Sequence, residues 1–194
     1  MGRPKEFDRN VVLDKAMDVF QSRGFEATSI TDLVEAMGIN RFTIYDTFTD
    51  KHKLFLESLD NYQQKRREHT AAMFAEPGPR IAIIRRYFTD IVENALTGGP
   101  SSCLMVNSAI ELARDDEETA TRAAYHFGQL EEMFYQALVE ARASGEIETN
   151  RDLRALARFL LNNARGLRVV TNYTRDRKVM SDIIEVALST LDSA

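Results

Sequence analysis

Two short helix patterns on either side of a glycine turn constrain the fold of this chain more than any other feature. Ser29 followed by Asp32 resembles a capping box, which predicts that a helix begins directly after Ser29. Gly38 is suited to end that helix, and Asn40 is suited to cap the next one, which runs to about Phe48. Two short helices joined by a turn of about three residues containing glycine have the spacing of a helix-turn-helix.

The second of these helices carries unusual residues on its outward side. Ile44 and Phe48 are four residues apart, so we expect them to form its buried side. The solvated face of a generic helical bundle would carry Glu and Lys rather than Thr, Phe and Tyr. The pattern therefore favours a binding helix, with a generic bundle as the alternative. Its outward face is Arg41, Phe42, Thr43, Tyr45 and Asp46.

The rest of the chain also has the pattern of helices. The 194 residues include 4 prolines and 9 glycines, and long segments without such residues favour helices. Clear breaks occur at "AEPGPR" and "TGGPSS", and we find no alternating strand pattern and no internal repeat. We expect an all-α fold of about nine helices. Outside the helix-turn-helix, the helices are expected at 8–23, 50–74, 79–96, 104–112, 117–143, 152–172 and 177–191.

Charge and composition limit the classes of function. The net charge of -5 by itself argues against a nucleic-acid binder, and residues 1–54 hold eight Lys and Arg against nine Asp and Glu. DNA binding would therefore depend on where the charges lie. No apolar run approaches the roughly 20 residues that cross a bilayer, so no membrane partner is expected. The single cysteine, Cys103, excludes an intrachain disulfide, and we expect a cytoplasmic protein.

Nothing in the sequence indicates an enzyme or a metal site. Three histidines without metal-ligand spacing, no nucleophile elbow and no phosphate-binding glycine loop leave no convergent acid–base set. The acidic run Asp115–Glu118 has no nearby histidine and is suited to a helix start, where carboxylates interact favourably with the helix dipole. We expect no cofactor and no metal.

Residues 24–55, "GFEATSITDLVEAMGINRFTIYDTFTDKHKLF", resemble the DNA-binding head of the TetR/AcrR family of one-component transcriptional regulators. This combination is far more specific than a bare helix-turn-helix. The remaining residues resemble the family only in helix layout. The residues that carry the resemblance are the Gly24-Phe25 pair, Thr28, Ile30, the Gly38-Ile39 turn, Tyr45, Phe48 and Lys51.

The resemblance implies a DNA-binding domain over residues 1–54 and an effector-binding and dimerisation domain over 55–194. The helix after Asn40 would enter the major groove, and a dimer would place two such helices about 34–36 Å apart on a palindromic operator. Tyr45, Lys51, Thr28 and Ser29 would contact phosphates. A basic arm containing Arg9 would reach the backbone or the minor groove. The expected DNA-contacting residues are Arg3, Lys5, Thr28, Ser29, Asn40, Arg41, Phe42, Thr43, Tyr45, Asp46 and Lys51.

Two positions depart from the family pattern. Phe42 stands where the family usually has a small residue, and Asp46 stands where it usually has a neutral or basic one. A carboxylate near phosphates is unfavourable unless it accepts a hydrogen bond from a cytosine amino group or pairs with Arg41. We therefore expect an unusual operator or weaker non-specific binding.

An effector pocket is expected between the middle helices. Large apolar pockets with few polar groups bind apolar or aromatic molecules, so we expect an effector of that kind, although the pattern favours an ordinary core position for any one wall residue taken alone. Cys103, near a helix start, is either a sensor of oxidants or electrophiles or a small buried hydrophobe. The candidate pocket residues are Tyr87, Phe88, Ile91, Met105, Asn107, His126, Phe127, Leu130, Phe134, Leu161 and Asn163.

By resemblance, the last two helices would form a four-helix bundle with their two-fold mates, whereas the alternative is that they close the monomer core. A two-fold operator favours an isologous homodimer. The chain is therefore expected to be a ligand-responsive repressor, with a helical interaction module that lacks DNA affinity as the alternative. The expected interface residues are Leu153, Leu156, Leu160, Leu167, Val179, Ile183, Val186 and Leu188.

Overall fold

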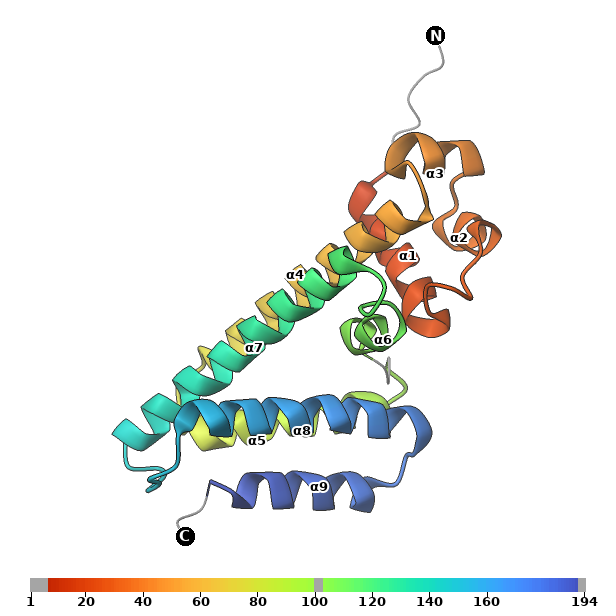
Figure 1. The fold of residues 1–194 in the computed structure, drawn as a ribbon. Helices are drawn as coiled ribbons and strands as arrows, with labels where there is room; N and C mark the ends of the chain where they lie inside the picture. The colour runs from red at the N-terminus through yellow and green to blue at the C-terminus, as the bar shows by residue number, and fades with distance from the viewer. Residues whose placement is uncertain (1–6, 100–102, 192–194) are drawn as a thin grey trace. The chain divides into compact units, whose positions relative to one another are not determined.

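The computed structural model describes residues 7–99 and 103–191, and over these ranges the chain is all-α (Figure 1), which confirms the expected fold class. The chain divides into two compact units. The head unit runs to Lys65 and includes Leu104–Ala123, and the body unit comprises Arg66–Cys103 and the residues from Ala124 onward. The nine helices of the described residues are α1 (Arg9–Arg23), α2 (Ile30–Met37), α3 (Arg41–Phe48), α4 (Lys51–Phe74), α5 (Arg80–Leu96), α6 (Leu104–Glu111), α7 (Glu117–Ala143), α8 (Leu153–Tyr173) and α9 (Arg177–Ser189).

Local capping signals set the helix bounds in the head unit. The side chain of Asp8 accepts hydrogen bonds from two backbone N–H groups at the start of α1. Ser29 and Asp32 form the predicted capping box at the start of α2. Gly38 ends α2 in the left-handed conformation, with φ of 72°, and Asn40 caps α3. The predicted helix-turn-helix is therefore present, because each turn residue has the backbone conformation that its position requires.

An aromatic cluster forms the centre of the head unit. The ring of Phe55 lies 5.1 Å from that of Phe20 and 4.9 Å from that of Phe25, measured between centroids. Leu33 of α2 and Ile44 of α3 are both fully buried, so the helix-turn-helix is anchored by its inner face. This burial leaves the opposite face of α3 available to solvent.

The body unit has a separate hydrophobic core. Phe88 and Phe134 are fully buried, and the ring of Tyr87 packs edge-on against that of Phe134 at 5.2 Å. Helices α5, α8 and α9 pack against one another, and their apolar stripes fill this core together with residues of α7 such as Phe134. Among the residues that the structure describes, none of the helices has both the length and the apolar character needed to cross a membrane.

Candidate functional site

Helix α3 presents polar and aromatic side chains to solvent. Phe42 is 77% exposed and Tyr45 is 42% exposed, whereas Ile44 and Phe48 are buried. The guanidinium carbon of Arg41 lies 5.9 Å from the centroid of the Tyr45 ring. A large apolar ring such as Phe42 gains nothing from standing in water, so its exposure marks this face as a candidate binding surface.

The first turn of α3 is fixed by Asn40 and Thr43. The Asn40 side-chain oxygen accepts hydrogen bonds from the backbone N–H of Thr43 at 2.8 Å and from its hydroxyl at 3.0 Å. Thr43 is half-buried, and Asp46 is exposed on the same helix. The residues predicted to read bases are therefore brought together on one short helix, while Asn40 already has a structural role as its cap.

The two residues ahead of α2 differ in position. Ser29 is exposed, and its backbone N–H and hydroxyl both donate to Asp32, whose pKa these bonds hold below its ordinary value. The Thr28 side chain is buried, and its hydroxyl donates to the carbonyl of Gly24 at 2.5 Å. Of this pair, Ser29 alone lies at the surface, and Thr28 closes the turn between α1 and α2.

Lys51 has protein partners for its ammonium group. Nζ donates to the carbonyls of Phe25 at 2.9 Å and Thr28 at 3.0 Å, and it lies 4.2 Å from the centroid of the Phe25 ring. These contacts join the start of α4 to the turn between α1 and α2. Lys51 thus has a structural role that the resemblance to the family did not indicate, and its contact with phosphate stays a prediction.

The predicted basic arm is only partly described. Arg3 and Lys5 lie outside the described residues. Arg9 lies within them, donates to Glu57 at 2.5 Å and stacks over the Phe48 ring at 4.7 Å. Its charge is therefore paired with a carboxylate of α4.

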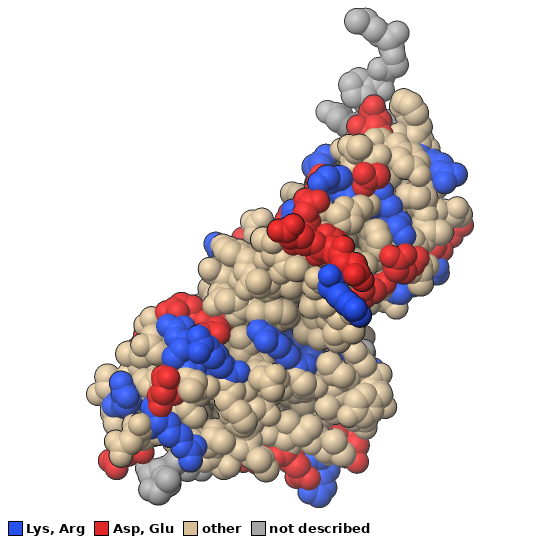
Figure 2. All heavy atoms as spheres, in the orientation of Figure 1, with Lys and Arg blue, Asp and Glu red and all other residues tan. Residues whose placement is uncertain are grey.

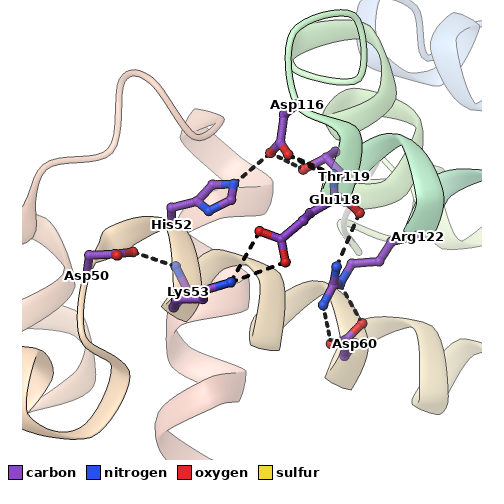
Figure 3. Close-up of polar contacts among 8 residues, drawn as sticks. All are labelled: Asp50, His52, Lys53, Asp60, Asp116, Glu118, Thr119 and Arg122. Carbon is purple, nitrogen blue, oxygen red and sulfur yellow. Dashed lines mark hydrogen bonds and ion pairs between the residues drawn. The ribbon is translucent and has the colours of Figure 1, made fainter.

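A set of polar contacts joins the start of α4 to the start of α7 within the head unit (Figure 3). Nε2 of His52 lies 2.7 Å from a carboxylate oxygen of Asp116, and Lys53 pairs with Glu118 at 3.2 Å. Asp116 also accepts from the hydroxyl of Thr119 at 2.7 Å. Burial raises the pKa of Asp116, but the hydrogen bonds with Thr119 and His52 together outweigh burial and lower this pKa to about 2.

Glu111 of α6 binds the turn between α1 and α2 within the head unit. Its carboxylate accepts from the backbone N–H groups of Phe25 at 3.0 Å and Glu26 at 2.9 Å. No local sequence pattern indicates this contact, because Glu111 lies far along the chain from the turn that it binds. The acidic run Asp115–Glu118 behaves as expected at its helix start, since Asp116 accepts from the N–H groups of Glu118 and Thr119.

Side chains of both charges are present on the molecular surface. On the face drawn in Figure 2, Lys and Arg side chains lie beside Asp and Glu side chains. Ion pairs between partly exposed side chains include Arg23 with Asp32 and Arg122 with Asp60. Among the described residues, no group of His, Cys, Asp and Glu is arranged to hold a metal ion.

A cavity of about 340 Å³ lies in the body unit between α4, α5 and α8. Two of the predicted pocket residues, Tyr87 and Ile91, line it. The lining also includes Arg66 and Arg168, so this cavity is more polar than the sequence suggested. The other predicted residues lie elsewhere. The core of the body unit contains Phe88, Leu130, Phe134 and Leu161, and Phe127 packs against this core. His126 is buried, Asn163 donates to the carbonyl of Phe159, and Met105 and Asn107 belong to the head unit.

Cys103 is buried at the end of the first segment of the body unit. Lys and Arg are absent from its sequence neighbourhood, but Arg165 of α8 interacts with it electrostatically. Sequence spacing could not reveal this cation, because it comes from a distant helix. The sensor role of Cys103 stays a prediction.

The predicted dimer residues fall into two groups. Val179 is 42% exposed and Val186 is 68% exposed on α9, with Ile183 partly buried. On α8, Phe159, Val169 and Tyr173 are further exposed apolar residues, and of these Val169 and Tyr173 were not predicted. Their positions do not follow the leucine stripe. Apolar residues on another side of the helix are the signal that could have identified them. The buried leucines of the predicted set, which belong to the core of the body unit, are Leu153, Leu156, Leu160, Leu167 and Leu188.

Comparison with known proteins identifies the family. A family model described as bacterial regulatory proteins, tetR family, matches residues 12–58. A second, described as tetracyclin repressor-like, C-terminal domain, matches residues 77–187. The chain belongs to the TetR family. It is therefore a helix-turn-helix transcriptional regulator, and its family is not one of enzymes.

Relatives of this TetR-family protein share nearly its whole length. An uncharacterized HTH-type transcriptional regulator of Bacillus subtilis (strain 168), YezE, is 36% identical over 99% of this chain and 100% of that protein. The HTH-type transcriptional repressor ComR of Escherichia coli (strain K12) is 35% identical over 98% of this chain and 90% of that protein. A cysteine mutant of the TetR-family regulator CifR, solved in complex with 26 bp double-strand operator DNA, superposes with a TM-score of 0.85 at 26% identity, covering 98% of this chain and 100% of that chain.

Proposed function

We propose that this protein is a homodimeric repressor that binds a palindromic double-stranded DNA operator through α3 and is released by a small-molecule effector. The observation that carries the proposal is the exposed face of α3, where Arg41, Phe42 and Tyr45 stand outward from a helix whose other side is buried. Arginine suits the O6 and N7 acceptors of guanine, and an aromatic ring suits a thymine methyl group.

The relatives support the DNA partner and the direction of regulation. CifR was solved with operator DNA, and ComR is named a repressor. In the proposed domain organisation, residues 1–54 bind DNA, and residues 55–194 bind the effector and form the dimer. Ser29, at the start of α2, and Tyr45 are the phosphate contacts that the exposed side chains favour.

Dimerisation is proposed through exposed apolar side chains of α8 and α9. Phe159, Tyr173 and Val186 stand in solvent in the single chain. Exposed apolar groups of this kind are enriched at interfaces, and a two-fold operator requires a two-fold protein. The buried leucines of the predicted set would support this surface from below rather than contact the partner.

Selection of bound duplexes from a random DNA library tests the proposal. We expect one palindromic motif, and we expect the double variant Arg41→Ala, Tyr45→Ala to bind it at least about tenfold more weakly, because one base contact is worth about 1–3 kcal/mol. Tyr125→Ala is the matched control, because Tyr125 is also an exposed aromatic residue but lies on α7. A folded dimer that selects no motif at low salt would instead indicate a helical interaction module.

A further inference from the structure

The two buried residues of α3 decide which of its side chains point furthest outward. Ile44 and Phe48 are buried and define the inner side of the helix. Successive residues of an α-helix are roughly 100° apart around its axis, so Phe42 lies roughly 140° from the middle of this inner side. On the same basis Arg41 lies roughly 40° from it and Tyr45 roughly 80°. Phe42 therefore stands near the centre of the outward face, and Arg41 and Tyr45 stand toward its edge.

The position of Phe42 is set by its backbone and not by packing of its ring. Phe42 is 77% exposed, so its side chain makes little contact with the rest of the chain. The residues on either side hold the first turn of α3, because the side-chain oxygen of Asn40 accepts from the backbone N–H of Thr43 at 2.8 Å and from its hydroxyl at 3.0 Å. The ring is therefore presented on a rigid element, which lowers the conformational cost of binding a partner.

The Tyr45 ring has a different environment. The guanidinium carbon of Arg41 lies 5.9 Å from its centroid, so the cation that suits guanine approaches Tyr45 on the same helix. Tyr45 is 42% exposed, which is less than Phe42. Among the described residues of the head unit, Phe42 is the most exposed aromatic residue. Phe42 is thus the aromatic side chain of α3 that is best placed to meet base edges.

A neighbouring charge limits the base that Phe42 faces. Asp46 is exposed and follows Phe42 by four residues, so the two side chains share one face of the helix. A carboxylate is unfavourable beside the O6 and N7 acceptors of guanine, but it does not oppose contact with a methyl group. The groups that bases present in the major groove are hydrogen-bond donors and acceptors, and the apolar exception is the C5-methyl group of thymine. An apolar ring at the centre of this face therefore gains most from a C5-methyl group.

We propose that Phe42 is a specificity-determining residue that reads the C5-methyl group of one thymine in each operator half-site. This inference rests on the proposed function and gives Phe42 a role separate from those of Arg41 and Tyr45. The methyl group of 5-methylcytosine occupies the same place in the major groove. Methylation of a cytosine at that position therefore creates the same contact.

Uracil substitution isolates the methyl group. The operator selected from the random library is resynthesised with deoxyuridine in place of each thymidine in turn, which removes the C5-methyl group and keeps every hydrogen-bonding group of the base. Affinities are measured by fluorescence anisotropy at one salt concentration, because DNA binding depends on salt. We expect one symmetric pair of thymines at which uracil weakens binding by about fourfold for each methyl group, the equivalent of about 0.8 kcal/mol for a buried carbon group. An operator that tolerates uracil at every position overturns the proposal.

Protein variants assign the methyl contact to Phe42. Phe42→Ala should bind the thymine and uracil operators equally, and Phe42→Leu, which keeps an apolar side chain, should retain part of the preference. Tyr45→Leu is the matched control on the same helix, and it should retain the full uracil effect even where its overall affinity falls. The titrations are made at low salt, where phosphate contacts keep weakened variants measurable. A uracil effect of wild-type size in Phe42→Ala, or its loss in Tyr45→Leu, overturns the assignment.

Cytosine and 5-methylcytosine test the same contact in a different base pair. At the sensitive position, the T·A pair is replaced by C·G with and without the C5-methyl group. The methylated operator should bind the wild type about fourfold more tightly for each methyl group, and it should give no gain with Phe42→Ala. Equal binding of the two operators by the wild type overturns the proposal. If the library yields no motif, the proposed function itself fails, whereas a palindromic operator without methyl dependence overturns this inference alone.

Discussion

Acid should destabilise this protein through His126. An unfolded chain takes up a proton on this histidine near pH 6.5, whereas the folded chain does so only near pH 4. Between these values the unfolded state binds more protons, so the free energy of unfolding falls as the pH falls. The stabilisation is present above pH 6.5 and is lost progressively down to pH 4.

The magnitude follows from the pKa values. One pKa unit corresponds to about 1.4 kcal/mol, so lowering the pKa of His126 from 6.5 to about 4 corresponds to about 3 kcal/mol in total. At pH 5 we expect a loss of about 2 kcal/mol relative to pH 7.5 from this residue. Such a loss is a large fraction of an ordinary stability of about 5–15 kcal/mol.

The assay is urea unfolding at pH 7.5, 6 and 5, at one protein concentration because a dimer's stability depends on it. The comparison is between the wild type and His126→Gln, in which the titrating group is absent. His52 and His69 are common to both proteins, so their contributions cancel. Carboxylates whose pKa values are lowered on folding, such as Glu76 and Glu93, are also common to both proteins, so their contributions cancel too.

The expected result is a decline from pH 7.5 to pH 5 that is about 2 kcal/mol larger in the wild type than in His126→Gln. Equal declines in the two proteins would refute the reasoning, because they would show that His126 is protonated as easily in the folded state as in the unfolded state. Arg66→Gln should retain most of the decline, because burial is the largest cause of the lowered pKa and the arginine charges are secondary.

Three further changes test the head unit. Lys51→Gln should lower the free energy of unfolding by about 2–3 kcal/mol by removing a charged donor from two carbonyls, while the salt dependence of operator binding stays unchanged; a shallower salt slope would instead make Lys51 a phosphate contact. Glu111→Gln should cost about 1–3 kcal/mol and speed hydrogen exchange at the amides of Phe25 and Glu26, and unchanged exchange would contradict the role of Glu111. Asp46→Asn should tighten non-specific DNA binding severalfold in mobility-shift titrations, since a charge pair in water at 4 Å is worth about 1 kcal/mol; weaker operator binding would show that Asp46 accepts from a base.

The helices and the helix-turn-helix could be predicted from the sequence because their signals are local. The Ser29 capping box, the left-handed Gly38 and the Asn40 cap each involve atoms within a few residues of one another. The burial of Ile44 and Phe48 follows from helical periodicity alone. The outward face of α3 follows from the same period, which is why its exposed residues could be named in advance.

Periodicity could not decide what each apolar stripe packs against. Leu160 and Leu167 of α8 form a stripe of the kind that suits either a core or an interface, and the structure places both in the core of the body unit. Exposed apolar residues such as Tyr173 lie on the other side of the helix. A stripe specifies which residues share a face, but the identity of the neighbouring surface depends on helices that are distant in sequence.

Charged side chains were the least predictable part of the site, because an ammonium or guanidinium group is satisfied by whatever oxygen the fold brings near. Lys51 is the first residue of α4, and its ammonium group lies within hydrogen-bonding distance of two carbonyls from the turn between α1 and α2. Arg165 shows the opposite outcome. Its Nε is buried and has no hydrogen-bond acceptor among the described residues. The first arrangement stabilises the head unit, and the second leaves a buried donor unpaired at a cost of about 1–3 kcal/mol. In both cases helices that are distant in sequence decide which oxygen atoms the cation meets, so no local pattern around Lys51 or Arg165 could indicate the outcome.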